Sequence, residues 1–465
     1  MSKLKFILSD LHLGADEGFK SHHVLENFSI DDQLGRFLQQ LRAESEQDRR
    51  EIELIINGDF LDFLQTPAID HYVPTEIYPP QAYLDSSQDA SVKRLNLIVN
   101  RHQPLFEALA HFMQAETPKR RITVIKGNHD APLYWPLVKS RLREVLDASG
   151  RRSSLLLFAA EFINREKIYV EHGHQRTEQI NRFPDFHDPR WPNNPTQLYF
   201  PPGSSLYVDL FNEVGRDRRF SDGIKPITTL IWLALRWDFD LAAKMLARLI
   251  GYTTAGQIAN PAAALALEPG LLMNQLADEH ERRQLAEQYN HDVAFRAEFH
   301  RQIQPYLTDI EALVPDATIA TPEEFCGDPV AIGRAEQSRQ QQNLQAAAAE
   351  IAHQQKAAVI VFGHTHQPVC QPLADGGLYL NTGCWLGPAD LTTAPVELWA
   401  ALFHNVLKPG DWPIRLPYAR IDYDEQDQPA GQLLDFADNE PVAAETTAKS
   451  TGFLTRLLNR FTVAR

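Results

Sequence analysis

Residues 4–12, which read LKFILSDLH, decide the fold. The first five of these residues form a short apolar run that contains a β-branched residue and ends at a polar segment, which predicts a buried β-strand. Asp10 and His12 follow it, one residue apart. In an extended segment such residues point the same way and can converge on one cation. Asp-x-His is common by chance, so this pair gains meaning only if the rest of the chain repeats the arrangement.

Further short apolar runs recur along the chain, and each reads as a buried strand. They are residues 52–56, 122–125, 168–170, 359–362 and 378–380. Helix-like segments at residues 31–44 and 91–115 separate the first three strands, which gives the β-α-β alternation of an α/β domain. In such domains ligands bind at the carboxyl ends of the strands. We therefore expect the functional site at these strand ends.

The second strand ends in residues 57–62, NGDFLD. Its glycine lets the backbone turn so that Asp59 can face the same cleft as Asp10. A carboxylate has two oxygens, so it can bridge two metal ions at the ~3.5 to 4 Å separation that suits phosphoester cleavage.

Three more strand ends carry ligand-type residues: residues 127–130 read GNHD, residues 171–174 read EHGH and residues 363–366 read GHTH. A surface histidine or a helix-capping aspartate would explain any one cluster. The same explanation would have to hold at five strand ends in succession. The sequence therefore predicts a metal site built from several strand ends.

The five elements resemble the pattern of the calcineurin-like metallophosphoesterase superfamily: Asp-x-His, Gly-Asp, Gly-Asn-His-Asp/Glu, a His before glycine, and Gly-His-x-His. The resemblance covers about residues 3–174 and 357–423. It implies an α/β fold, a four-layer α/β/β/α sandwich with a large, mainly helical insertion. It also implies a metal-dependent phosphoester hydrolase.

The resemblance implies a dinuclear site. The expected ligands are Asp10, His12 and His366 for the first metal, Asp59 as the bridge, and Asn128, His172 and His364 for the second. This mixed set without thiolate suits Mn²⁺, our first choice, as well as Fe²⁺ or Zn²⁺. We expect two divalent ions.

The resemblance also assigns two catalytic residues. His129 would contact the substrate phosphate and protonate the leaving oxygen, and Asp62 would orient its ring. An imidazole that carries a proton near neutral pH can serve as a general acid. A metal-bridged hydroxide would attack phosphorus in line, without a covalent enzyme intermediate.

Some features indicate which branch of the superfamily the chain resembles. Protein Ser/Thr phosphatases of the superfamily have arginine after the second aspartate of Gly-Asp-x-x-Asp, whereas Phe63 follows Asp62 here. Gln175 and Asn181, together with the turn at residues 381–383, look more like the bacterial branch that includes UDP-2,3-diacylglucosamine pyrophosphatase. The insertion is larger than in that enzyme, so we expect the branch and not the substrate to carry over.

The composition divides the chain into segments. The residue composition changes after residue 172. A Pro- and aromatic-rich loop comes first, and helical patterns follow, which include residues 271–306 and 334–356. After residue 424 the chain becomes acidic, which reads as a solvated linker. The expected order is a catalytic domain in two parts (1–172 and 357–423), a helical cap over the cleft (173–356), an acidic linker (424–450) and an amphipathic helix (451–465).

Other residues are weaker candidates for the functional site or for a contact surface. His174 either lines the site and helps to hold His172, or is a plain loop residue. Arg216, Arg218 and Arg219 form the densest basic cluster of the insertion, and they either bind a substrate phosphate or form a solvated face. The apolar face of residues 451–465 either contacts an anionic membrane surface or docks on protein, as part of this chain or of a dimer.

Charge and cysteine content bound the function. The 465 residues carry 45 Lys and Arg against 61 Asp and Glu, a net charge of −16, which disfavours binding of nucleic acid. We expect a small or lipid-linked phosphoester or pyrophosphate as substrate. A nuclease or an inactive scaffold is the alternative. The three cysteines show no CxxC spacing, and residues 6–8 are too short for a signal-peptide core, so we expect a cytoplasmic protein.

Overall fold

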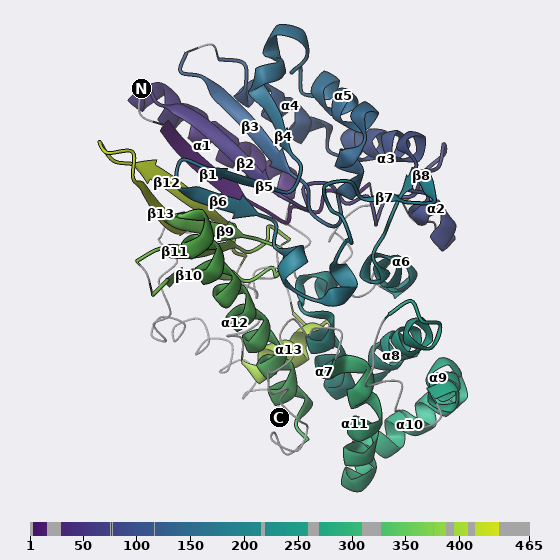
Figure 1. Ribbon diagram of the computed structural model, residues 1–465. Coiled ribbons are helices and arrows are strands. Elements are labelled where there is room, and N and C mark those ends of the chain that lie inside the picture. Colours follow the sequence, from purple (N-terminus) through teal and green to yellow (C-terminus); the bar gives the residue numbers. More distant parts are fainter. Residues whose placement is uncertain are drawn as a thin grey trace.

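Two β-sheets packed face to face form the centre of the computed structural model, with helices on their outer faces (Figure 1). The helical segments of residues 173–356 extend away from one end of this sandwich. The predicted helix at residues 451–465 lies outside the described residues. The structure describes residues 3–15, 29–74, 76, 78–115, 117–214, 219–258, 269–308, 327–374, 376–386, 395–407 and 414–436.

The first sheet has the strand order β13-β12-β1-β2-β3-β4. The neighbours from β1 to β4 are parallel, whereas β12 runs antiparallel to β1 and to β13. The chain therefore returns to this sheet after the second sheet is complete. There β12 pairs with the edge of β1 that does not pair with β2. The bounds are β1 Lys3–Leu8, β2 Glu51–Asn57, β3 Arg120–Ile125, β4 Leu156–Ala159, β12 Pro417–Tyr423 and β13 Pro429–Asp435.

The second sheet has the order β10-β11-β9-β6-β5. Strands β6, β9 and β11 are parallel, and the two edge strands run antiparallel to their neighbours. The bounds are β5 Phe162–Arg165, β6 Ile168–Glu171, β9 Val359–Phe362, β10 Pro368–Pro372 and β11 Leu378–Thr382.

The layers are held together by three apolar interfaces. Ile7, Ile55 and Val361 belong to the cluster that fills the space between the two sheets. Helices α1 Ile30–Asp48, α3 Gln88–Arg101, α4 Gln103–Phe112 and α5 Pro136–Val145 bury their apolar faces on the first sheet. Helix α12 Pro329–Gln355 packs Leu344 and Ile351 against the second. The predicted four-layer α/β/β/α fold is confirmed.

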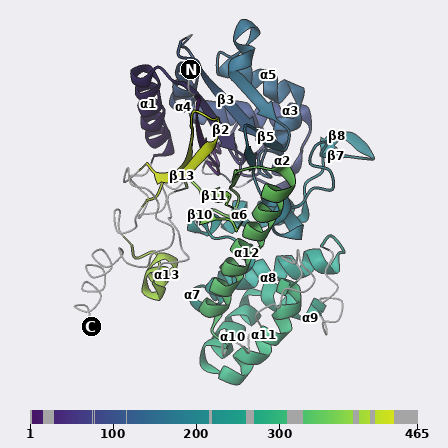
Figure 2. The ribbon, with the colours of Figure 1, turned by 60° about the vertical axis from the view of Figure 1, so that its left-hand side comes forward.

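The insertion has an apolar core of its own, in which Trp232 and Leu246 are fully buried. Figure 2 shows how α12 links its helices to the sandwich. No helix in the described part of the chain combines the length and hydropathy that crossing a bilayer requires. The insertion contains β7 Arg190–Trp191, β8 Asn194–Leu198, α6 Pro202–Val214, α7 Ile227–Trp237, α8 Phe239–Thr254, α9 Pro269–Ala277, α10 Glu279–His291, α11 Val293–Thr308 and α12.

Short helices complete the fold. Helix α13 Val396–Phe403 follows the insertion in the sequence, between β11 and β12. Its Trp399 packs into the apolar core of the insertion. The others are α2 Pro80–Leu84 and the single-turn segments Ala131–Tyr134, Gly150–Leu155, His174–Arg176, Gln179–Asn181 and Arg219–Gly223.

Three sequence predictions need correction. The helix predicted over residues 91–115 is broken at His102, because a proline follows in the first turn of α4 and lacks an N–H. Residues 271–306 form three helices because Asp278 and Asp292 accept hydrogen bonds from backbone N–H groups and begin new ones. The linker predicted from residue 424 contains β13, so the catalytic domain continues beyond residue 423.

Candidate metal centre

Strand ends from both sheets meet at one place. Asp10 and His12 follow β1, Asp59 follows β2 and Asn128 follows β3. His172 follows β6 of the second sheet, and His364 and His366 follow β9. Parallel strands present their carboxyl ends at one edge, and the two sheets face each other with these edges together. The fold therefore gathers side chains that lie far apart in sequence.

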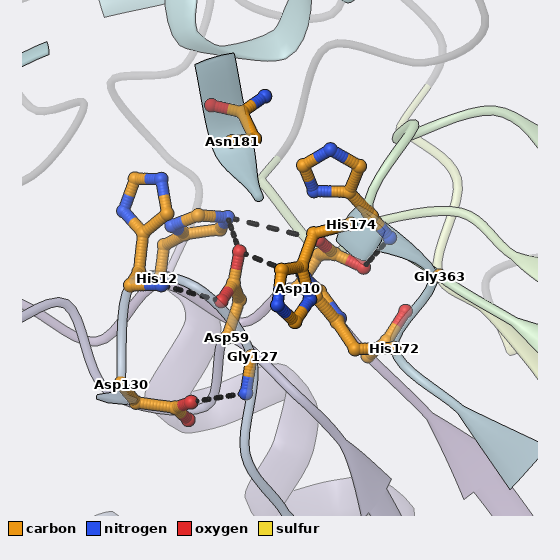
Figure 3. A network of polar contacts seen from close by, with 12 residues as sticks. Asp10, His12, Asp59, Gly127, Asp130, His172, His174, Asn181 and Gly363 are labelled. Atoms are coloured by element: carbon orange, nitrogen blue, oxygen red, sulfur yellow. Dashed lines mark hydrogen bonds and ion pairs between the residues drawn. The ribbon is translucent and has the colours of Figure 1, made fainter. Parts of the chain in front are cut away.

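The first cluster consists of Asp10, His12 and His366 (Figure 3 shows Asp10 and His12). The Oδ1 of Asp10 lies 3.3 Å from Nε2 of His366 and 3.8 Å from Nε2 of His12. The two imidazole Nε2 atoms are 3.3 Å apart. One carboxylate oxygen and two ring nitrogens thus face one another at distances that suit ligation of a single cation.

The second cluster consists of Asp59, His172 and His364. The Oδ2 of Asp59 lies 3.1 Å from Nε2 of His172 and 3.7 Å from Nε2 of His12. The same carboxylate oxygen therefore faces both clusters, as a bridging ligand would. Its other oxygen accepts the backbone N–H of His129 at 2.9 Å, which fixes the carboxylate.

Ligand-type atoms without hydrogen bonds mark the space between the clusters. Asp10 Oδ1, Asn128 Oδ1 and His172 Nε2 are buried and have no hydrogen-bond partner among the described residues. A buried polar atom left unpaired costs roughly 1–3 kcal/mol. Nitrogen and oxygen donors of this kind suit divalent transition metals. The residues present therefore fit two divalent cations, and they do not select which metal.

Close backbone approach makes this convergence feasible. A Cβ atom added to Gly127 would overlap the Asp59 carboxylate, and one added to Gly363 would lie 2.7 Å from Oδ2 of Asp10. Asp130 ties two strand ends together by accepting the N–H groups of Gly127 at 2.5 Å and Phe60 at 2.9 Å. Burial and the nearby Asp59 raise the pKa of Asp130.

Five of the predicted ligand residues have an uncommon backbone conformation. Left-handed φ values of 44° to 69° occur at Asp10, His12, Asp59, His364 and His366. Such values cost roughly 1–2 kcal/mol per residue that is not glycine. Hydrogen bonds oppose this cost, including those from the N–H of His364 to Oδ2 of Asp10 and from the N–H of Asp10 to the carbonyl of Gly58.

Asp62 connects the first cluster to His129. Its Oδ2 lies 3.0 Å from Nδ1 of His12 and 3.0 Å from Nδ1 of His129. Its Oδ1 accepts the N–H groups of Leu64 and Gln65. Burial would raise the pKa of Asp62, but His129 and the hydrogen bond from His12 hold it well below the ordinary value. An ionised carboxylate only accepts, so both rings donate from Nδ1 and keep Nε2 for other partners.

His174 does not take part in either cluster. Its ring lies 5.5 Å from that of His172 and 4.3 Å from that of Phe186, with neither nitrogen hydrogen-bonded among the described residues. Burial lowers the pKa of His174, which keeps the ring neutral. Arg216, Arg218 and the side chain of Arg219 lie outside the described residues.

The insertion adds residues that the sequence did not single out. Glu178 Oε2 lies 3.5 Å from Nε2 of His364, and the Tyr207 ring lies 4.6 Å from that of His129, edge to face. With Asn181 and Lys225 they line a small cavity of about 30 Å³ beside Asn128 and His129. Of these four insertion residues, only Asn181 was named from the sequence, on the basis of the family resemblance. The positions of the others depend on how the insertion packs.

The comparison with protein families agrees with this geometry. Residues 6–228 match the family model described as calcineurin-like phosphoesterase, so the chain contains a calcineurin-like phosphoesterase domain. The matched range ends before His364 and His366, which the fold brings to the same centre. No curated protein matches the chain. The closer resemblance to UDP-2,3-diacylglucosamine pyrophosphatases stays a prediction.

Proposed function

We propose that this chain hydrolyses a small or lipid-linked phosphoester or pyrophosphate and depends on two divalent cations. The observation that carries the proposal is the placement of Asp59 Oδ2, which faces His12 of one cluster and His172 of the other. His129, which belongs to neither ligand set in our assignment, lies beside this centre. The family match over residues 6–228 supports the same class of reaction.

Two bound divalent cations would supply a water nucleophile at neutral pH and stabilise charge on the phosphoryl oxygens. Asp10, His12 and His366 would hold one cation, Asn128, His172 and His364 the other, and Asp59 both. His129 donates from Nδ1 to Asp62, which fixes the ring, and in its doubly protonated form the ring would give the proton on Nε2 to the leaving oxygen and keep the one on Nδ1.

The insertion shapes where the substrate enters. Tyr207 contacts the His129 ring, and Gln65 donates to the Tyr207 hydroxyl, so the catalytic domain and α6 meet at the proposed general acid. The cavity beside His129 is small and lined largely by the insertion. This supports a compact phosphate group over a nucleic-acid strand, as does the net charge of −16. Attachment to a membrane through residues 451–465 and cytoplasmic residence stay predictions.

Metal removal tests the proposal. Chelation should abolish hydrolysis of aryl phosphates, sugar nucleotides or pyrophosphates, and Mn²⁺ should restore it, because the water nucleophile requires the cations. His129→Ala should retain both metals and lose ~10² to 10⁴-fold in turnover, the usual contribution of a general acid. His111→Ala is the matched control, since the ring of this exposed α4 histidine bonds only Gln114 among the described residues. Unchanged turnover in excess chelator, with metal loss confirmed by elemental analysis, would refute the proposal.

A further inference from the structure

Lys225 is the one lysine or arginine among the described residues that line the cavity beside His129. The same cavity contains the proposed metal ligand Asn128 and the proposed general acid His129. Lys225 comes from the insertion, two residues before α7 begins at Ile227. The insertion therefore places a positive charge in the cavity beside His129, where the substrate is proposed to bind.

Contacts from both parts of the protein fix the backbone of Lys225. Its carbonyl accepts the side-chain amide of Gln337 in α12 at 3.0 Å and that of Gln367 at 3.4 Å. Gln367 directly follows the proposed ligand His366. The lysine is thus held between the insertion and the loop of the first metal cluster.

The side chain of Lys225 rests on an aromatic ring. Its Nζ lies 5.8 Å from the centre of the Tyr207 ring, which in turn contacts His129. A cation over an aromatic face is held by the ring quadrupole and keeps its hydrogen-bond donors available. Tyr207 therefore positions the ammonium group close to the proposed general acid.

The charge of Lys225 has no carboxylate partner among the described residues: none lies within 4.0 Å of its Nζ. Glu178 is the one carboxylate in the cavity lining, and it already accepts from Gln340 at 2.8 Å and from Asn181 at 3.1 Å. An ammonium at a partly buried site is stabilised by an anion. The ammonium group of Lys225 is therefore available to bind an anion that enters the cavity.

We propose that Lys225 binds a negative charge of the substrate beyond the one that the two cations and His129 neutralise. The chain then prefers phosphomonoesters and phosphoanhydrides, which carry two or more charges, over singly charged phosphodiesters. This inference rests on the proposed function and names its substrate class. Because Lys225 and His129 line the same cavity, the extra charge is expected on the reacting phosphate or directly beside it.

Phosphate binding and a pair of aryl esters test this role. The full chain, loaded with Mn²⁺, is titrated calorimetrically with inorganic phosphate. Then kcat and KM are measured for p-nitrophenyl phosphate and for bis(p-nitrophenyl) phosphate. Lys225→Met should weaken phosphate binding and raise the monoester KM by roughly 10- to 100-fold, the worth of a charge-assisted hydrogen bond. The diester KM should change by less than about threefold, because it lacks the charge that Lys225 binds.

Two further variants sharpen the result. Lys225→Arg keeps the charge and should recover most of the phosphate affinity. Lys244→Met removes an insertion lysine that pairs with Asp240 in α8, and it should change neither ester. Metal content and circular dichroism of each variant show that the fold persists. Should Lys225→Met not fold, Lys225→Gln takes its place in the same comparison.

The outcomes separate this inference from the proposed function. Equal phosphate affinity of the wild type and Lys225→Met, or equal losses on both esters, would overturn the role of Lys225 while leaving hydrolysis intact. Phosphate bound through Lys225 by a protein that hydrolyses no phosphoester would overturn the proposed function and keep the anion site.

Discussion

At the scale of single residues, one oxygen of Asp62 serves two histidines with different tasks. Oδ2 accepts from Nδ1 of His12, a proposed metal ligand, and from Nδ1 of His129, the proposed general acid. A hydrogen-bonded carboxylate orients a ligand histidine and raises its basicity. Metal affinity and proton transfer are therefore linked through one side chain.

Asp62→Asn should impair both tasks. Loss of the negative charge should lower metal affinity at the first cluster by roughly 10- to 100-fold, and the misoriented His129 should lower kcat by ~10² to 10⁴-fold. Calorimetric titration with Mn²⁺ and steady-state kinetics measure the two effects separately. His129→Ala is the comparison, because it should affect kcat alone. If Asp62→Asn also left metal affinity unchanged, the hydrogen bond to His12 would have no role in ligation.

The convergence of the proposed ligand residues was predictable from sequence because each of them follows a buried strand, and a strand end is a local signal. Glu178, Tyr207 and Lys225 lie in a segment where nothing local distinguishes them from surface residues. They reach the centre through contacts between the insertion and the catalytic domain, such as those of Tyr207 with Gln65 and His129. Tertiary packing of an insertion sets such positions, so the sequence prediction stopped at its boundary.

At the scale of elements, a buried charge network joins the two sheets away from the metal centre. Glu53 of β2 accepts from Lys5 of β1 at 2.9 Å, from Thr123 of β3 at 2.6 Å and from Arg165 of β5 in the second sheet. Burial would raise the pKa of Glu53, but Lys5, Thr123 and Arg165 lower it below the ordinary 4.5. The folded state thus favours the ionised form.

Glu53→Gln should destabilise the protein by about 3 kcal/mol, because Lys5 and Arg165 lose a buried partner. The folded pKa lies below the unfolded value of 4.5, so the folded state binds fewer protons in that range. This contribution is fully present above pH 4.5 and is lost as the pH falls through the folded pKa. Urea unfolding at pH 7 and pH 4 measures the difference.

The control for this test is Glu51→Gln on the same strand, since Glu51 is partly exposed and lies 3.8 Å from Arg121. Exposed pairs contribute roughly 0–1 kcal/mol. A Glu53→Gln deficit no larger than that of Glu51→Gln, or one that grows below pH 4.5, would contradict the network.

Apolar strands were easier to predict than amphipathic ones. Strands β1, β2, β3, β6, β9 and β11 were expected from apolar runs. Strand β13 was missed because its exposed and buried residues alternate within a polar, proline-containing segment. Its pairing with β12, and that of β12 with β1, join parts of the chain that no local pattern connects. Side-chain caps at Asp278 and Asp292 likewise divided helices that helical periodicity alone had joined.

At the scale of the whole molecule, the proposed ligands come from both sheets. Asp10 and Asp59 belong to the first sheet, and His172, His364 and His366 to the second. A cation held by both sets connects the two sheets, and it compensates buried ligand atoms that lack hydrogen-bond partners. Metal content should therefore control the stability of the fold as well as its chemistry.

Removal of metal should lower the melting temperature. A ligand at 100 times its dissociation constant stabilises the folded state by about 2.7 kcal/mol, which corresponds to a change of several degrees in Tm. Scanning calorimetry with Mn²⁺ and with chelator measures it. His366→Ala should show a smaller response, because one cluster loses a ligand. Identical melting temperatures with and without metal would contradict a structural role for the cations.

The separation of the ligands along the chain sets when the centre can assemble in the cell. The N–H of His364 binds Oδ2 of Asp10, a residue 354 positions earlier, and the whole insertion is translated between them. At about 5–20 residues per second, this interval lasts roughly 20–70 s. During that time the ribosome-bound chain exposes Asp10, His12 and Asp59 without the histidines that complete either cluster. Metal loading is therefore expected to be a late step of biogenesis, after the segment that carries His364 and His366 has left the ribosome.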